Sequence, residues 1–184
     1  MRRLIILFGF LILFSCGEDT LPKPKAFLSL EYTNAVYSDL LLKRPYRFEV
    51  PEKAIVKDEP RNWLKIKYPE LKASLDITYR SIDNDNLREL LIESERLVFK
   101  HTVKAEQISS NNFTNEDRRV YGTLYEITGN AASQIQFHIT DSTKNFIKGA
   151  LYFNTKPNYD SILPAVDYIK KDILRLMETL EWEK

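Results

Sequence analysis

Few side chains in this sequence could carry out chemistry. The chain has two histidines, His101 and His138, and on paper Ser142 and Asp141 could join His138 in a Ser-His-Asp arrangement. Adjacent residues at the end of a strand point in different directions, which disfavours that arrangement. Neither histidine has a partner at the H-x-x-H or C-x-x-C spacing of metal sites. We therefore predict no catalytic, cofactor-binding or metal-binding site.

Each histidine also has a structural explanation. His101 falls on or beside the apolar stripe of a predicted helix, where we expect a hydrogen-bonded boundary residue. His138 alternates with the apolar residues Ile135, Phe137 and Ile139. It is therefore predicted on the opposite face of that strand, packed in contact with solvent.

Cys16 is the only cysteine of the chain and ends a short apolar run. Arg2 and Arg3 precede that run, residues 4–14, which is too short to span a bilayer because a spanning helix needs about 20 residues. The preceding Leu13 and Ser15 make the site resemble the bacterial lipobox, and the resemblance implies a diacylglycerol on the Cys16 thiol and a mature chain that begins there. The alternative is a lone buried thiol in an unprocessed chain. We predict residues 1–15 to be a signal peptide and the protein to be anchored by lipid in the cell envelope, with the outer membrane favoured over the inner and the domain facing the periplasm or the cell surface.

The remaining 169 residues suit one domain with one hydrophobic core. Without Arg2 and Arg3 the chain has 25 basic and 26 acidic side chains, a balance that argues against nucleic-acid binding. Residues 16–25 contain Pro22 and Pro24 and are predicted to form an extended tether to a single domain at 26–184. Glu18 with Asp19 resembles a surface-export signal of Bacteroidetes lipoproteins, although ordinary linker charges explain the pair equally well.

Hydrophobic periodicity predicts an α+β fold. Residues 106–119 are expected to be a short strand near Ile108 followed by a polar loop. An antiparallel sheet of about six or seven strands, covered by two main helices, accounts for the pattern. At this coarse level the order of elements looks like the PsbP and Mog1 fold, an analogy that carries no function. The predicted strands are 27–32, 46–50, 63–68, 75–80, 120–128, 134–140 and 146–153, and the predicted helices run from about 85 to 104 and from about 159 to the C-terminus.

Several segments together resemble the gliding-motility lipoprotein GldD family. The similarity covers nearly the whole chain after Cys16. It implies a Bacteroidetes lipoprotein required for gliding motility, associated with the type IX secretion machinery and without known enzymatic activity. The partners it implies are the membrane, through the lipid, and other gliding or secretion proteins of the envelope. The segments are Trp63-Leu64-Lys65-Ile66-Lys67-Tyr68-Pro69, Gly129-Asn130-Ala131-Ala132-Ser133, Asp141-Ser142-Thr143-Lys144, Leu151-Tyr152-Phe153-Asn154 and Met177-Glu178-Thr179-Leu180-Glu181-Trp182.

Possible partner contacts lie in the predicted strand 120–128 and the turn after it. Tyr121, Thr123 and Tyr125 share one face of that strand, and an exposed aromatic face suits a protein interface. Core or cross-strand packing is the alternative. Asn130 could lie in a binding loop or simply adopt turn geometry.

Two other functions remain open at this stage. A ligand-binding lipoprotein would hold an apolar pocket between the sheet and the helices, as the many aromatic residues would allow. A hydrolase is the third candidate. Asp-Thr-Leu, Asp-Ser-Thr and Asp-Ser-Ile, beginning at Asp19, Asp141 and Asp160, resemble a Bacteroidetes O-glycosylation pattern, but such short patterns also arise by chance.

Overall fold

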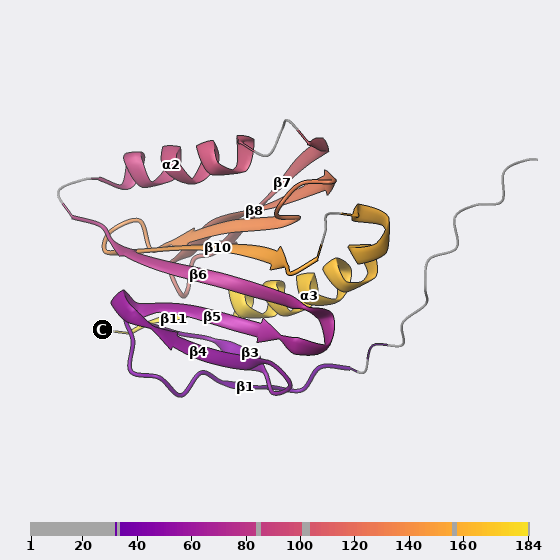
Figure 1. Ribbon diagram of the computed structural model, residues 1–184. Helices are drawn as coiled ribbons and strands as arrows, with labels where there is room; N and C mark the ends of the chain where they lie inside the picture. The colour runs from indigo at the N-terminus through magenta and orange to yellow at the C-terminus, as the bar shows by residue number, and fades with distance from the viewer. Residues whose placement is uncertain (1–31, 33, 84–85, 101–103, 156–157, 184) are drawn as a thin grey trace, which may run out of the picture.

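The fold is built on one seven-stranded antiparallel sheet, seen in a computed structural model that describes residues 32, 34–83, 86–100, 104–155 and 158–183 (Figure 1). The strand order is β4-β5-β6-β10-β9-β8-β7. This arrangement confirms the predicted α+β class. The strands are β4 (Ile55–Glu59), β5 (Trp63–Tyr68), β6 (Ala73–Ser81), β7 (Ala105–Asn115), β8 (Val120–Gly129), β9 (Ile135–Thr140) and β10 (Asn145–Phe153).

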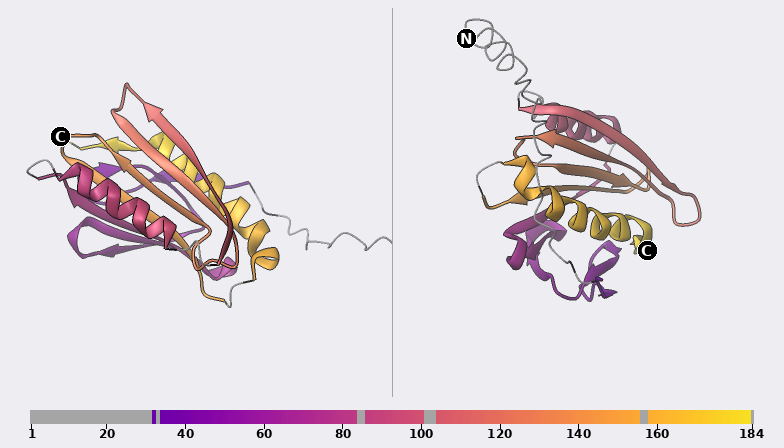
Figure 2. Two further views of the ribbon diagram at one scale, coloured as in Figure 1. Left: turned by 90° about the horizontal axis from the view of Figure 1, so that it is seen from above. Right: turned by 90° about the vertical axis from the view of Figure 1, so that its right-hand side faces the viewer.

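Two helices cover opposite faces of this sheet, as Figure 2 shows. The long helix α3 (Tyr159–Thr179) lies on the apolar face and buries Ile169, Ile173 and Leu176 against it. The shorter helix α2 (Leu87–Phe99) lies on the other face and buries Leu90 and Val98. Strand residues alternate between the two faces. The sheet is therefore the middle layer of three over part of its area.

A set of short strands closes the apolar core on the far side of α3. β1 (Tyr37–Asp39) pairs with β3 (Glu49–Pro51), and β2 (Tyr46–Arg47) pairs with β11 (Glu181–Trp182). Tyr46 in β2 is fully buried, and its hydroxyl group donates a hydrogen bond to the Asn62 carbonyl at 2.5 Å. The first and last parts of the described chain thus meet in one small sheet.

Gly149 shows how closely the apolar face is packed. It lies directly opposite Phe137 on the neighbouring strand, and a Cβ at this position would lie 2.3 Å from ring carbons of Phe137. The absence of a side chain at Gly149 therefore makes room for the Phe137 ring in the core.

The sequence predictions were wrong at two places in the sheet. Residues 105–115 form the continuous edge strand β7 instead of a short strand and a polar loop. The Asn and Ser residues of this segment give no apolar alternation, because its side chains are largely exposed. Its backbone nevertheless pairs with β8. Strand β4 was not predicted at all. Residues 27–31 of the predicted strand 27–32 lie outside the described residues, and so do the signal peptide, Cys16, the tether and His101; Tyr32 belongs to no strand.

Helix α2 ends at Phe99, five residues before its predicted end. Within the described part of the chain, neither helix has the length and apolar character needed to cross a bilayer.

Candidate functional site

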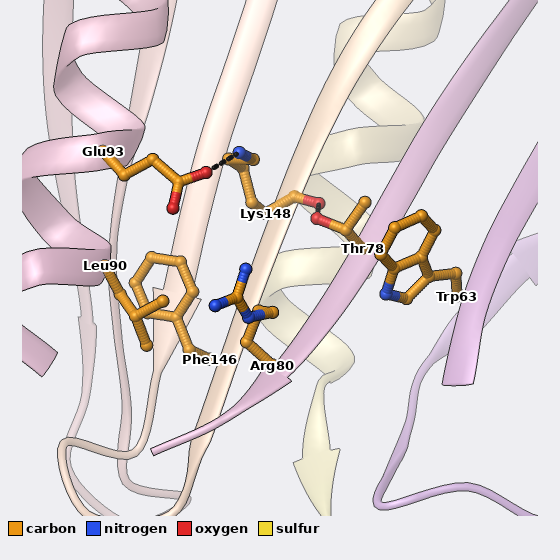
Figure 3. Close-up of a pocket in the computed structure, with 7 residues that line it drawn as sticks. All are labelled: Trp63, Thr78, Arg80, Leu90, Glu93, Phe146 and Lys148. Carbon is orange, nitrogen blue, oxygen red and sulfur yellow. Dashed lines mark hydrogen bonds and ion pairs between the residues drawn. The ribbon is translucent and has the colours of Figure 1, made fainter. Parts of the chain in front are cut away.

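A small cavity lies between α2 and the sheet and is the candidate functional site (Figure 3). Its volume is about 130 Å³. Side chains from β5, β6 and β10 form one wall, and two residues of α2 form the other. The lining residues are Trp63, Thr78, Arg80, Leu90, Glu93, Phe146 and Lys148.

The charges of this cavity are partly neutralised. The Lys148 Nζ lies 3.6 Å from Oε1 of Glu93, and this ion pair links the sheet to α2. The Thr78 hydroxyl donates a hydrogen bond to the Lys148 carbonyl at 3.3 Å. Both ionic side chains are partly exposed, so the pair contributes only about 0–1 kcal/mol to stability. The cavity thus combines a few charged side chains with a mostly apolar lining.

Behind Phe146, His138 is buried under α2. Its ring stacks on Phe146 with centroids 5.8 Å apart and lies 6.0 Å from the Tyr125 ring. His138 lies on the strand face opposite the apolar residues, as predicted. The predicted contact with solvent was wrong, because α2 covers this face and His138 is only 5 % exposed. Burial lowers the pKa of His138 to about 4, so the imidazole is neutral at pH 7.

Asp141 serves the β9–β10 turn. Its Oδ1 accepts hydrogen bonds from the backbone amides of Thr143, Lys144 and Asn145 at 2.8–2.9 Å, and its Oδ2 accepts one from the Asn145 side chain at 2.7 Å. Burial alone would raise the pKa of Asp141, but the three amide donors and the Asn145 side chain outweigh it and hold the pKa below its usual range. The carboxylate is therefore committed to the turn, and the described contacts do not join Ser142, His138 and Asp141.

The four predicted partner-contact residues lie in different surroundings. Tyr121 donates a hydrogen bond to Glu116 at 2.8 Å, and Thr123 donates one to the Asn112 side chain at 3.2 Å; both are partly buried. Tyr125 is buried and packs with Val98 of α2. Asn130 is exposed, and its side-chain oxygen accepts a hydrogen bond from the Tyr159 amide at 3.0 Å, at the start of α3. A role in partner contact stays a prediction for all four.

The chemistry available at this site is limited. The cavity volume is well below the roughly 300 Å³ at which pockets for small organic ligands usually begin. Among the described residues, no group of three or more His, Cys, Asp or Glu side chains could hold a metal ion. The arrangement can bind water or a small ion and can couple α2 to the sheet.

Sequence reasoning missed the most unusual carboxylate of the domain. Asp172 on α3 is only 4 % exposed, and it lies between the helix and the η3 turn (Pro69–Leu71), beside a second cavity. Its position three residues after Ile169 and four before Leu176 places it on the buried stripe of the helix. That spacing was a signal that could have identified it.

Fold and site together define a class of protein: an α+β domain with a three-layered centre, in which helices cover both faces of the sheet. The chain belongs to the gliding motility lipoprotein GldD family, whose sequence profile matches residues 17–182. A comparison with curated proteins gave no match. Membership of this family makes the chain a gliding motility lipoprotein, a lipid-anchored protein of the cell envelope.

Proposed function

We propose that this protein is a non-enzymatic component of the gliding and type IX secretion machinery of a Bacteroidetes cell envelope. The observation that carries the proposal is the family match, which begins at residue 17, directly after Cys16. In this proposal residues 1–15 are removed and Cys16 carries the lipid. Residues 16–25 then hold a single domain, 26–184, close to the membrane. Two or more acyl chains make such an anchor stable, since each buried methylene contributes about 0.8 kcal/mol.

The non-enzymatic role is supported by the structural contacts that the polar side chains already make. Asp141 holds a turn, and His138 is packed between two aromatic rings. A general base must reach the proton that it removes, and a buried imidazole under a helix is poorly placed to do so. We expect a His138→Leu strain to keep its gliding speed, and a motionless strain with normal protein levels would contradict a non-enzymatic role.

Docking on other envelope proteins is the task that we assign to the β7–β8 hairpin. β7 is an 11-residue strand that pairs with β8, and its other edge borders no strand of the described sheet. Such an edge can accept an extended segment of a partner. Tyr121 and Thr123 lie on this hairpin and, although partly buried, retain access to solvent. We name Asn112, Tyr121 and Thr123 the hairpin face.

Two experiments test this function. In a deletion strain, complementation with Cys16→Ser is expected to restore neither gliding nor type IX export, whereas the conservative tether change Thr20→Ser restores both. Normal gliding with Cys16→Ser would refute the lipid anchor. Gliding and export that persist in the deletion strain itself would refute the proposed role in the machinery.

The hairpin face is tested by crosslinking in living cells. A photoreactive residue at Asn112 is expected to capture motility or secretion proteins of the envelope, whereas the same residue at the exposed Lys171 on α3 captures few of them. Equal capture at both positions, or capture of none of these proteins at Asn112, would show that the hairpin face is not the docking surface.

A further inference from the structure

A cluster of lysines lies on the outward face of β4 and β5, at the end of the sheet near the η3 turn. α2 packs mainly on β9 and β10, and the side chains at this end of the face keep access to solvent. Lys57 on β4 lies directly opposite Lys65 on β5, and Lys67 lies beside both. Lys72 follows in the turn before β6. We call Lys57, Lys65, Lys67 and Lys72 the lysine face.

The lysine face has an excess of positive charge. Lys65, Lys67 and Lys72 line an open hollow of about 640 Å³, and among the described residues that line it none carries a negative charge. Lys65 alone has a close acidic neighbour on this face, since its Nζ lies 3.0 Å from Oδ2 of Asp76. Contact with Lys57 and then the charge of Lys57 lower the pKa of Lys67, and the opposing effect of Glu59 is smaller.

The fold alone does not explain this arrangement. Like charges directly opposite each other on neighbouring strands are destabilising, as for Lys57 and Lys65. Lysines on an edge strand can prevent aggregation, which would account for Lys57 on the edge strand β4. It does not account for Lys67 on the inner strand β5. The cluster therefore indicates an anionic partner.

Exposed apolar side chains on the same face favour a lipid surface as that partner. Ile55 is 51 % exposed and lies directly opposite Lys67, and Tyr152 is 40 % exposed on β10. Ser74 lies between Lys67 and Tyr152, so one row across the sheet has an apolar side chain at each end. Lysine with exposed tyrosine and aliphatic side chains is typical of surfaces that lie in the interface between membrane and water. A free anion or an acidic protein segment would not require the two apolar ends.

The described chain also begins at this end of the domain. Tyr32 lines a cavity together with Tyr68 and Pro69, and the latter two also line the hollow of the lysine face. Cys16 precedes Tyr32 by 16 residues, which can span at most roughly 55 Å. A lipid on Cys16 would therefore keep the lysine face within reach of the headgroups. We propose that the lysine face docks on anionic lipid headgroups of the anchoring membrane, an inference that rests on the lipid anchor of the proposed function.

Docking is tested with the full lipoprotein reconstituted in vesicles. With Cys16 lipidated, Asn154→Cys supplies the only free thiol, at an exposed position that lines the hollow. The emission of an environment-sensitive fluorophore on this thiol is expected to shift to shorter wavelength in vesicles of equal parts phosphatidylcholine and phosphatidylglycerol, but not in phosphatidylcholine alone. The same fluorophore at Asn112→Cys, on the opposite edge strand β7, does not respond. Raising the salt from about 0.1 to 1 M shortens the screening length from about 10 to 3 Å and is expected to reverse the shift.

Charge variants separate the lysine face from the overall charge of the protein. A lysine near an anionic surface contributes about fivefold to binding, so removing three lowers the ratio of docked to free domain on the order of 100-fold. A matched variant loses the same charge at exposed lysines elsewhere and is expected to keep the shift. The first variant combines Lys57→Gln, Lys67→Gln and Lys72→Gln, and the matched variant combines Lys100→Gln, Lys144→Gln and Lys171→Gln.

Flotation of the vesicles reports the lipid anchor separately. A protein that does not float with them would overturn the anchor and the docking together. A protein that floats but whose label responds equally in neutral and anionic vesicles, or equally in the two charge variants, would overturn the docking alone. Capture of an acidic envelope protein by a photoreactive residue at Asn154 in cells, without any response to anionic vesicles, would assign the lysine face to a protein partner instead.

Discussion

His138 is expected to make the stability of the domain depend on pH in a defined window. In the unfolded chain the imidazole has a pKa of 6.5, and burial lowers it to about 4 in the folded protein. Between these values the unfolded chain binds a proton that the folded domain does not. The free energy of unfolding therefore has its full value above pH 6.5, as far as His138 is concerned, and decreases as the pH falls towards 4.

The size of this effect follows from the two pKa values. Proton linkage lowers the free energy of unfolding by about 2 kcal/mol between pH 7 and pH 5, and by about 3 kcal/mol once the pH is below 4. A loss of 2 kcal/mol is a large fraction of the 5–15 kcal/mol typical of a folded domain.

Urea unfolding followed by the fluorescence of Trp63 and Trp182 measures this loss. His138→Leu removes the titrating imidazole, whereas every other titratable group is the same in both proteins. We expect the wild-type protein to lose about 2 kcal/mol more than the variant between pH 7 and pH 5. Equal losses in the two proteins would refute the burial argument for His138.

Three further substitutions test the packing described above. Asp141→Ala removes the acceptor of three turn amides and is expected to lower the unfolding free energy by about 2–3 kcal/mol, while Asp117→Ala on an exposed turn changes it little; equal losses in urea melts would contradict the turn's role. Gly149→Ala is expected to cost about 1–3 kcal/mol, and adding Phe137→Leu should recover part of that loss; strictly additive losses would show that the two sites do not touch. Asn130→Ala removes the acceptor at the start of α3 and is expected to cost about 1 kcal/mol, measured by thermal melting, without loss of gliding; gliding lost at unchanged stability would instead assign Asn130 to partner contact.

Long, periodic segments could be predicted from the sequence because one physical signal dominated them. The stripe through Ile169, Ile173 and Leu176 specifies α3, and the alternation in β5 and β6 specifies their hairpin. Strand β7 could not be predicted in this way. Much of it is exposed at the sheet edge, so its side chains carry little hydrophobic alternation, and its pairing with β8 is a long-range property.

The sites were harder to predict than the fold for a similar reason. His138 and Asp172 are polar residues whose burial depends on which helix covers them, and that is decided by tertiary packing. The alternation around His138 identified its face but could not show that α2 lies over it. Tyr37 and Tyr68 come from distant parts of the chain, so their convergence on Asp172 is invisible in the sequence.

The pairing of β2 with β11 bears on the order in which parts of the domain fold. The last residues of the chain complete the small sheet: the Glu183 amide donates to the Pro45 carbonyl at 2.9 Å, and the Trp182 indole donates to the Arg119 carbonyl at 3.0 Å. Because β2 and β11 lie on either side of nearly the whole described sheet in the sequence, their pairing closes a very long loop of chain. We therefore expect this small sheet to be among the last parts of the domain to form during folding.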